Sequence, residues 1–197
     1  MAALATRHHE FLAAGARLFA ITVDSPPQNS FVMTDLALPF PLLSDPDRTN
    51  AITPLGFADE KDPRLISRPG SIVVAPGGEE TWRYLGRDYA DRPQEDLLLD
   101  QVAGLGLSAV GQDTPEVGDP VRGPNGTSTK ALPTYFRGSK FAALALRGRY
   151  RTLGDEFRDD TKLHVQMTDR YIEAISAALE RRAKRGGPGR SPPFSWS

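Results

Sequence analysis

The stretch from Arg68 to Ala75 constrains the fold of this chain more than any other. Arg68, Pro69 and Gly70 lead into an apolar run, Ser71–Ala75, which Pro76-Gly77-Gly78 ends. A short apolar run between turn residues, rich in β-branched side chains, predicts a fully buried strand. Proline has no N–H to donate, so Pro69 belongs before the strand. We therefore expect Arg68 at the mouth of a core strand, where its guanidinium can face a cleft.

Composition excludes several classes of protein. The 197 residues contain no cysteine, which rules out disulfides, thiolate zinc sites and thiol chemistry. The net charge of −1 gives no general attraction to nucleic acid or membrane, and no apolar run approaches about 18 residues. The first 14 residues lack the basic start and apolar core of a signal peptide. We expect a cytoplasmic protein that binds neither nucleic acid nor membrane and has no metal or cofactor.

Helical and strand patterns alternate in the first half of the chain. The periodicity predicts helices over 2–14, 27–37 and 48–55, and a last helix from an N-cap at Asp91 to about 105. Strands are expected at 18–23, which resembles a buried parallel strand, and at 42–43. Residues 71–75 and 81–85 should form a hairpin, with Trp82 and Tyr84 packing on one face. This order favours an α/β sandwich with a mixed sheet.

Composition changes twice in the second half of the chain. We predict a folded domain over residues 1–107, a glycine- and proline-rich linker over 108–132 that cannot order itself, and a helical extension over 133–183. Within the extension, residues 139–146 suggest a short helix, and 155–183 a long amphipathic one with an acidic start and a basic end. Residues 184–197 are expected to be a disordered, basic tail.

Three segments together resemble the peroxiredoxin family. They are 15–24 (GARLFAITVD), 38–47 (LPFPLLSDPD) and 67–74 (SRPGSIVV), and they are most similar to the branch of alkyl hydroperoxide reductases and thiol-specific antioxidants. The resemblance covers roughly Ala2 to Leu105. It implies a thioredoxin-like three-layer sandwich with a mixed sheet, here followed by a helical C-terminal extension. It also implies an antioxidant oxidoreductase that reduces hydroperoxides.

The chain departs from the family pattern at the catalytic residue. Family members begin with a strand and a loop that carries the peroxidatic cysteine, and we expect both to be missing here. Serine and threonine cannot replace a thiolate that becomes a sulfenic acid, so we predict no catalytic residue and no peroxidase activity. Arg68 and Pro69 match the remnant of the family active site. The resemblance implies that Arg68 polarised the peroxide, and it places Pro69 or Gly70 near a cis-proline position, with the isomer of Pro69 left open.

Simpler interpretations compete with a functional one at several positions. For Arg68, the favoured interpretation is a surface arginine that pairs a nearby acid such as Asp45 or Asp47. His8 and His9 point about 100° apart on a helix and lack zinc-ligand spacing, and His164 suggests a solvated or half-buried residue. The acidic residues at 155–160 indicate a helix N-terminus rather than a catalytic pair of carboxylates.

Three functional hypotheses follow from these patterns. The first is a non-catalytic peroxiredoxin-like protein that binds a partner, either a second copy in a homodimer or a redox protein. The second is a fragment of an active thiol peroxidase whose first strand and cysteine lie upstream of Met1. The third is a binding module that acts through the apolar stripe of the helix over residues 155–183.

Overall fold

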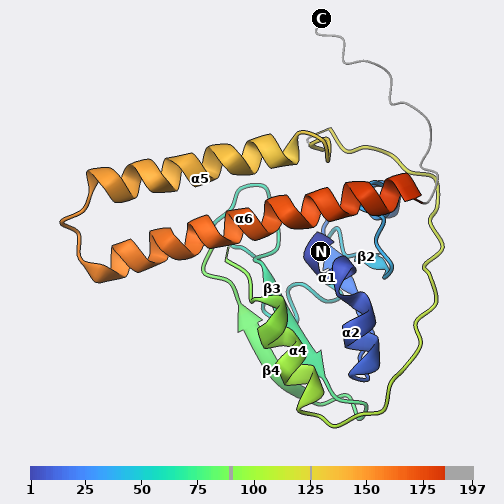
Figure 1. Ribbon diagram of the computed structural model, residues 1–197. Coiled ribbons are helices and arrows are strands. Elements are labelled where there is room, and N and C mark those ends of the chain that lie inside the picture. Colours follow the sequence, from blue (N-terminus) through green and yellow to red (C-terminus); the bar gives the residue numbers. More distant parts are fainter. Residues whose placement is uncertain (89–90, 125, 185–197) are drawn as a thin grey trace, which may run out of the picture.

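The computed structural model describes residues 1–88, 91–124 and 126–184 (Figure 1). The chain is mixed α/β, and the predicted basic tail, 184–197, lies outside the described residues apart from Lys184. The elements in chain order are α1 (Ala2–Thr6), α2 (His8–Ala13), β1 (Ala20–Thr22), α3 (Pro26–Asp35), β2 (Leu42–Ser44), β3 (Gly70–Val74), β4 (Glu80–Leu85), α4 (Glu95–Ala103), α5 (Leu132–Arg149) and α6 (Asp155–Lys184). Over these residues, no helix has the length and apolar character needed to cross a membrane.

The first predicted helix is divided into α1 and α2 at Arg7. The backbone of Arg7 leaves helical geometry (φ −103°, ψ 11°), while its guanidinium binds Glu10 at 2.8 Å and Asp96 of α4 at 2.5 Å. Gly15 ends α2, as predicted, with a φ of +88° that favours glycine. A Cβ atom there would also overlap the side chain of Leu107, at 2.6 Å. Arg7, where the helix divides, thus contacts an acid 89 residues away, which helical periodicity does not reveal.

The start of α3 agrees with the helix predicted over 27–37 within one residue and is capped by Ser25. The Ser25 N–H donates to Oε1 of Gln28 at 2.8 Å, which completes a capping box, and Pro26 and Pro27 occupy the first turn. The helix predicted for 48–55 is wrong, because the structure has a series of turns there. Arg48 has a φ of +62°, which a right-handed helix cannot accommodate.

The strands form two separate pairs among the described residues. β1 runs parallel to β2, with Ala20 opposite Leu42, and β3 runs antiparallel to β4, with Val73 opposite Trp82. The parallel strand and the hairpin were both predicted, whereas a single mixed sheet is not formed. β1 and β3 therefore each keep one edge without a strand partner.

The strands are also less buried than predicted. Phe19 beside β1 is 60% exposed, Ile21 within it is 38% exposed, and Val74 of β3 is 50% exposed. Only Val73 is buried in β3. A two-stranded sheet that packs helices on one face leaves alternate side chains in solvent, since the side chains of a strand point to opposite faces.

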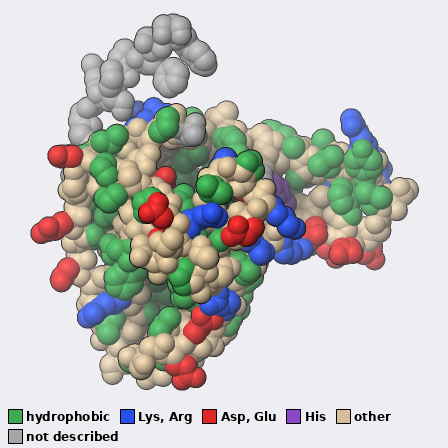
Figure 2. All heavy atoms as spheres, turned by 180° about the vertical axis from the view of Figure 1, so that it is seen from behind, with side chains coloured by type: hydrophobic (Ala, Val, Ile, Leu, Met, Phe, Trp, Pro, Cys, Tyr) green, Lys and Arg blue, Asp and Glu red, His purple; other side chains and the backbone are tan. Residues whose placement is uncertain are grey.

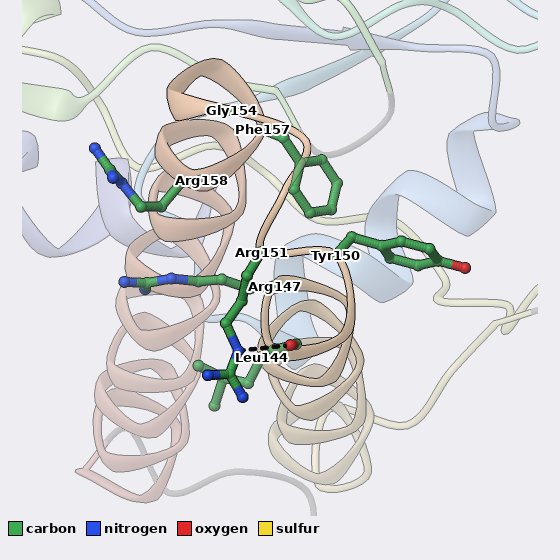
Figure 3. A pocket seen from close by; sticks show the side chains of 8 residues that line it. Leu144, Arg147, Tyr150, Arg151, Gly154, Phe157 and Arg158 are labelled. Atoms are coloured by element: carbon green, nitrogen blue, oxygen red, sulfur yellow. Dashed lines mark hydrogen bonds between the residues drawn. The ribbon is translucent and has the colours of Figure 1, made fainter.

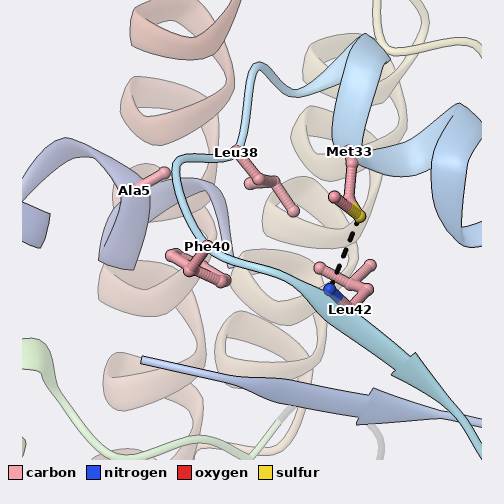
Figure 4. Close-up of a cluster of buried hydrophobic side chains, with 5 residues drawn as sticks. All are labelled: Ala5, Met33, Leu38, Phe40 and Leu42. Atoms are coloured by element: carbon pink, nitrogen blue, oxygen red, sulfur yellow. Dashed lines mark hydrogen bonds between the residues drawn. The ribbon is translucent and has the colours of Figure 1, made fainter. Parts of the chain in front are cut away.

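Two apolar clusters hold the α/β part together. One joins α1, α3 and β2, and Figure 4 shows Met33, Leu38 and Phe40 in it, with the Leu42 N–H directed at the sulfur of Met33 at 3.5 Å. The other surrounds Phe11, which is 1% exposed, with Val73 of β3 and Leu98 and Val102 of α4. Trp82 packs against this second cluster, which confirms its predicted place in the core.

The segment from Gly106 to Ala131 has no helix or strand in its described residues. It runs along the outside of the α/β part (Figure 1), with hydrogen bonds from the Val110 N–H to Leu12 at 2.9 Å and from the Val121 N–H to Pro27 at 2.9 Å. Thr129 donates to Asp35 of α3. The segment is thus irregular, as expected, but the body of the protein holds it in place.

α5 and α6 form a long antiparallel hairpin that lies across one end of the α/β part (Figure 1). α5 is longer than the predicted 139–146, and α6 agrees with the predicted 155–183 within one residue. Arg182 of α6 pairs with Asp35, and Ala178, with no exposed surface, packs against Ala2 of α1. The apolar stripe of α6 is largely covered within the chain itself.

Candidate functional site

Arg68 and Pro69 lie directly before β3, as predicted, and face Gly86 at the end of β4. Nη2 of Arg68 donates to the carbonyl oxygen of Gly86 at 2.6 Å. The backbone N–H of Arg68 donates to Phe57 at 2.7 Å, and that of Gly86 donates to Pro69 at 2.7 Å. The expected ion pair of Arg68 with Asp45 or Asp47 is wrong, because the guanidinium binds a backbone carbonyl. The peptide bond before Pro69 is trans.

Phe57, whose carbonyl oxygen accepts the Arg68 N–H, also packs its ring between Gly70 and Arg83. A Cβ atom at Gly70 would overlap the ring of Phe57, so glycine is required there by close packing. The guanidinium of Arg83 lies 5.0 Å from the centroid of the Phe57 ring and pairs with Glu80 at 2.6 Å. Sequence reasoning singled out Trp82 and Tyr84 but passed over Arg83. The alternation along β4 was the available signal, since it places Arg83 on the opposite face from Trp82.

Asp45 serves the backbone rather than an active site. It is 1% exposed, and its carboxylate accepts the N–H groups of Ile52 at 2.8 Å, Ala51 at 2.9 Å and Asn50 at 3.1 Å. These donors, with Ile52 the largest contributor, hold the pKa of Asp45 below its usual value although burial opposes them. Asp45 therefore satisfies the backbone N–H groups of a loop.

Asp91 belongs to a polar cluster at the end of the hairpin instead of capping α4, whose N-cap is Gln94. It accepts the hydroxyl of Tyr84 at 2.5 Å and the N–H of Arg87 at 2.8 Å. Arg87 also reaches Asp160 of α6 at 3.3 Å. Burial, with the hydrogen bond to Asp91, raises the pKa of Tyr84 to about 12. The local sequence predicted Asp91 as the N-cap of this helix, but its side chain binds Tyr84 and Arg87 instead.

Titration of Tyr84 tests this cluster. We expect the Tyr84→Phe variant to remove one phenol that ionises near pH 12, as followed by ultraviolet absorbance of the phenolate. Folding raises this pKa from 10, so the stabilisation is complete below pH 10 and is lost as the pH rises from 10 to about 12. The thermal midpoint of the wild type should therefore fall more steeply with pH in that window than the midpoint of the variant. Equal slopes would contradict the arrangement.

His8 and His164 are engaged in structural contacts. Nε2 of His8 lies 2.9 Å from Oε1 of Gln112, and the His8 ring is 5.9 Å from that of Phe40. Nε2 of His164 lies 2.8 Å from the hydroxyl of Ser139. Among the residues that the structure describes, no group of three histidines, cysteines or carboxylates could hold a metal ion. His8 and His164 therefore help to join elements that are distant in sequence.

Gln112 is a structural residue that sequence reasoning missed. Its side-chain amide accepts the N–H of Leu18 at 3.0 Å and donates to the oxygen of the same residue at 2.6 Å. It thus satisfies both backbone groups just before β1, as a neighbouring strand would. No sequence signal could have shown this, because Gln112 sits in an irregular segment 94 residues away.

Around Arg68, then, the structure shows backbone and packing contacts at the start of the β3–β4 hairpin, and the chain contains no cysteine. Residues 1–79 match the AhpC/TSA family. This part of the chain, which contains β1, β2 and β3, is similar to that peroxiredoxin family, whose members have a thioredoxin-like fold. Searches of curated proteins and of solved structures gave no match.

Proposed function

We propose that this protein is a non-peroxidatic homologue of the AhpC/TSA peroxidases and that it acts by binding. The observation that carries this proposal is the state of the remnant site. The chain has no cysteine, and Arg68, which the family resemblance assigns to the peroxide, donates to the carbonyl oxygen of Gly86. In a catalytic member of the family, this guanidinium would face the peroxide. Here it binds a backbone carbonyl oxygen instead.

Chemistry supports the same conclusion. A thiol peroxidase needs a thiolate of lowered pKa, which attacks one peroxide oxygen and becomes a sulfenic acid. Arginines stabilise charge at such a site but cannot take up the oxygen. The 197 residues contain nothing that supplies this step.

We expect the purified chain to consume no peroxide. Hydrogen peroxide and a thiol reductant would be mixed with the protein, and peroxide loss followed by a dye assay. The expected rate equals that of the reductant alone, while a cysteine-containing peroxidase of the family serves as the positive control. A rate well above this background, proportional to protein concentration, would show that the proposal is wrong.

A second candidate is that these residues are one part of an active thiol peroxidase. The divided sheet favours it, since β1 and β3 each keep an open edge that an added strand could occupy. Such a strand, followed by a cysteine, would lie upstream of Met1. An in-frame apolar segment with a cysteine in the coding sequence supports this candidate, and an in-frame stop codon directly upstream rejects it.

Partner binding through the C-terminal helices is the third candidate. The stripe on α6 that suggested it faces α1 and α5 in large part, with Met167 and Ile175 buried. The outward face of α5 is the more accessible one, since Tyr135 is 60% and Phe141 65% exposed. A homodimer or a complex with a redox protein would accordingly use α5.

A further inference from the structure

The turn between α5 and α6 contains a cavity of about 480 Å³ (Figure 3). This volume lies within the range of small-molecule sites, roughly 300–1,000 Å³. Three arginines and three apolar side chains contribute to its lining: Arg147, Arg151, Arg158, Leu144, Tyr150 and Phe157. Gly148 and Gly154 border open space, since a Cβ atom on either would meet nothing within 4 Å.

The arginines differ in how their charge is satisfied. Arg158 pairs with Asp155 at 2.9 Å, and Nε of Arg151 donates to the carbonyl oxygen of Gly148 at 3.0 Å. Arg147 is half-buried, and its guanidinium has no hydrogen-bond or ion-pair partner among the residues described. A guanidinium is always charged and presents planar donors that match a carboxylate, sulfate or phosphate. The cavity therefore offers one unsatisfied cation to an anion.

Further basic residues surround Arg147 in the sequence. Between Pro120 and Gly154 the chain carries seven arginines and lysines and no aspartate or glutamate. Figure 2 shows hydrophobic side chains gathered at the free end of the hairpin, with basic side chains beside them and acidic ones on its lower side. Acidic residues follow directly at the start of α6, where Asp155 pairs with Arg158 and not with Arg147.

The apolar part of the cavity lining consists of Leu144 and two aromatic rings. The rings of Tyr150 and Phe157 meet edge to face, with centroids 6.3 Å apart, and Leu144 is 40% exposed. In Figure 3, Arg147 and Arg158 extend to one side of the hairpin, away from these two rings. A ligand with a charged group at Arg147 and a hydrocarbon body against Phe157 and Leu144 would satisfy both halves of the cavity.

We propose that the cavity at the α5–α6 turn binds a small amphipathic acid, with its anionic group on Arg147 and its apolar body against Leu144 and Phe157. This inference deepens the proposed binding role and names the ligand class. It does not depend on the peroxide assay, because peroxidase activity would reject the proposed function without affecting this cavity.

The test uses the full chain and anilinonaphthalene sulfonate, an aromatic sulfonate whose fluorescence rises on binding. We expect Arg147→Ala to raise the dissociation constant of this probe by about tenfold, the order expected for a lost charge-assisted hydrogen bond. Arg149→Ala is the matched control, because it removes the same charge from the same helix but lies outside the cavity lining; its constant should stay within about twofold. Circular dichroism would confirm that both variants fold.

Competition separates the two halves of the cavity. Decyl sulfate, below its micelle concentration, should displace the probe, whereas inorganic sulfate and decanol at equal concentration should displace little. Equal weakening by Arg147→Ala and Arg149→Ala would overturn the proposal in favour of general charge attraction. Displacement by decanol as complete as by decyl sulfate would overturn it in favour of an apolar patch.

Discussion

Phe11→Ala is expected to lower the free energy of unfolding by about 3–5 kcal/mol, the usual cost of removing a fully buried ring. Phe11 lies on α2 and is 1% exposed. It packs against β3 and α4 in a cluster with Val73, Leu98 and Val102. The α/β part has only small clusters of this kind, so little neighbouring structure can collapse into the space left behind. Chemical denaturation followed by circular dichroism measures the change.

Phe19→Ala is the matched control for this substitution. Phe19 lies close in sequence and loses the same ring, but it is 60% exposed beside β1. Its removal should change the free energy of unfolding by no more than about 0.5 kcal/mol. A loss below about 1 kcal/mol for Phe11→Ala would contradict the central place of this side chain in the core.

Asp45→Asn should lower the thermal midpoint at neutral pH by about 5 °C or more, because a charged acceptor of three backbone N–H groups is lost. The pH dependence gives the sharper result. Folding lowers the pKa of Asp45 from 3.8, so its stabilisation is complete above that value and is lost as the pH falls through the lower folded pKa. The difference between wild type and variant should therefore be largest near neutral pH and shrink below pH 3.8.

Asp47→Asn separates this effect from the general loss of negative charge. Asp47 is exposed two residues further on, and its substitution should leave the midpoint within about 1 °C at each pH. A pH-independent difference between wild type and Asp45→Asn would show that the carboxylate charge does not stabilise the 48–55 turns. Differential scanning calorimetry between pH 2.5 and 7 is the suitable measurement.

Local patterns predicted those elements that local contacts determine. Ser25 and Gln28 form a capping box three residues apart, and Gly15 ends a helix through its own φ. The alternation around Trp82 predicted the hairpin, since its strands follow each other in the chain. The helix predicted for 48–55 failed because Asp45 gathers the N–H groups of residues 50 to 52 into turns.

The site shows the same division between local and distant contacts. The sequence placed Arg68 and Pro69 correctly before β3, because proline excludes itself from the strand. It did not identify the partner of Arg68, which is a carbonyl oxygen 18 residues away. It also missed the cavity beside Arg147, since the lining residues come from the facing ends of two helices.

By itself, the sequence determined the chemistry that this protein lacks and the local signals that start and end its helices. A chain without cysteine has no thiolate, whatever its fold, and the Arg68–Ala75 stretch had to enter a strand after Pro69. Only the tertiary structure decided that the strands form two separate pairs, that Arg68 binds Gly86 and that α1 and α5 cover much of the apolar stripe of α6. These outcomes depend on contacts between segments far apart in the chain, whose pairing is selected by the packing of the whole molecule.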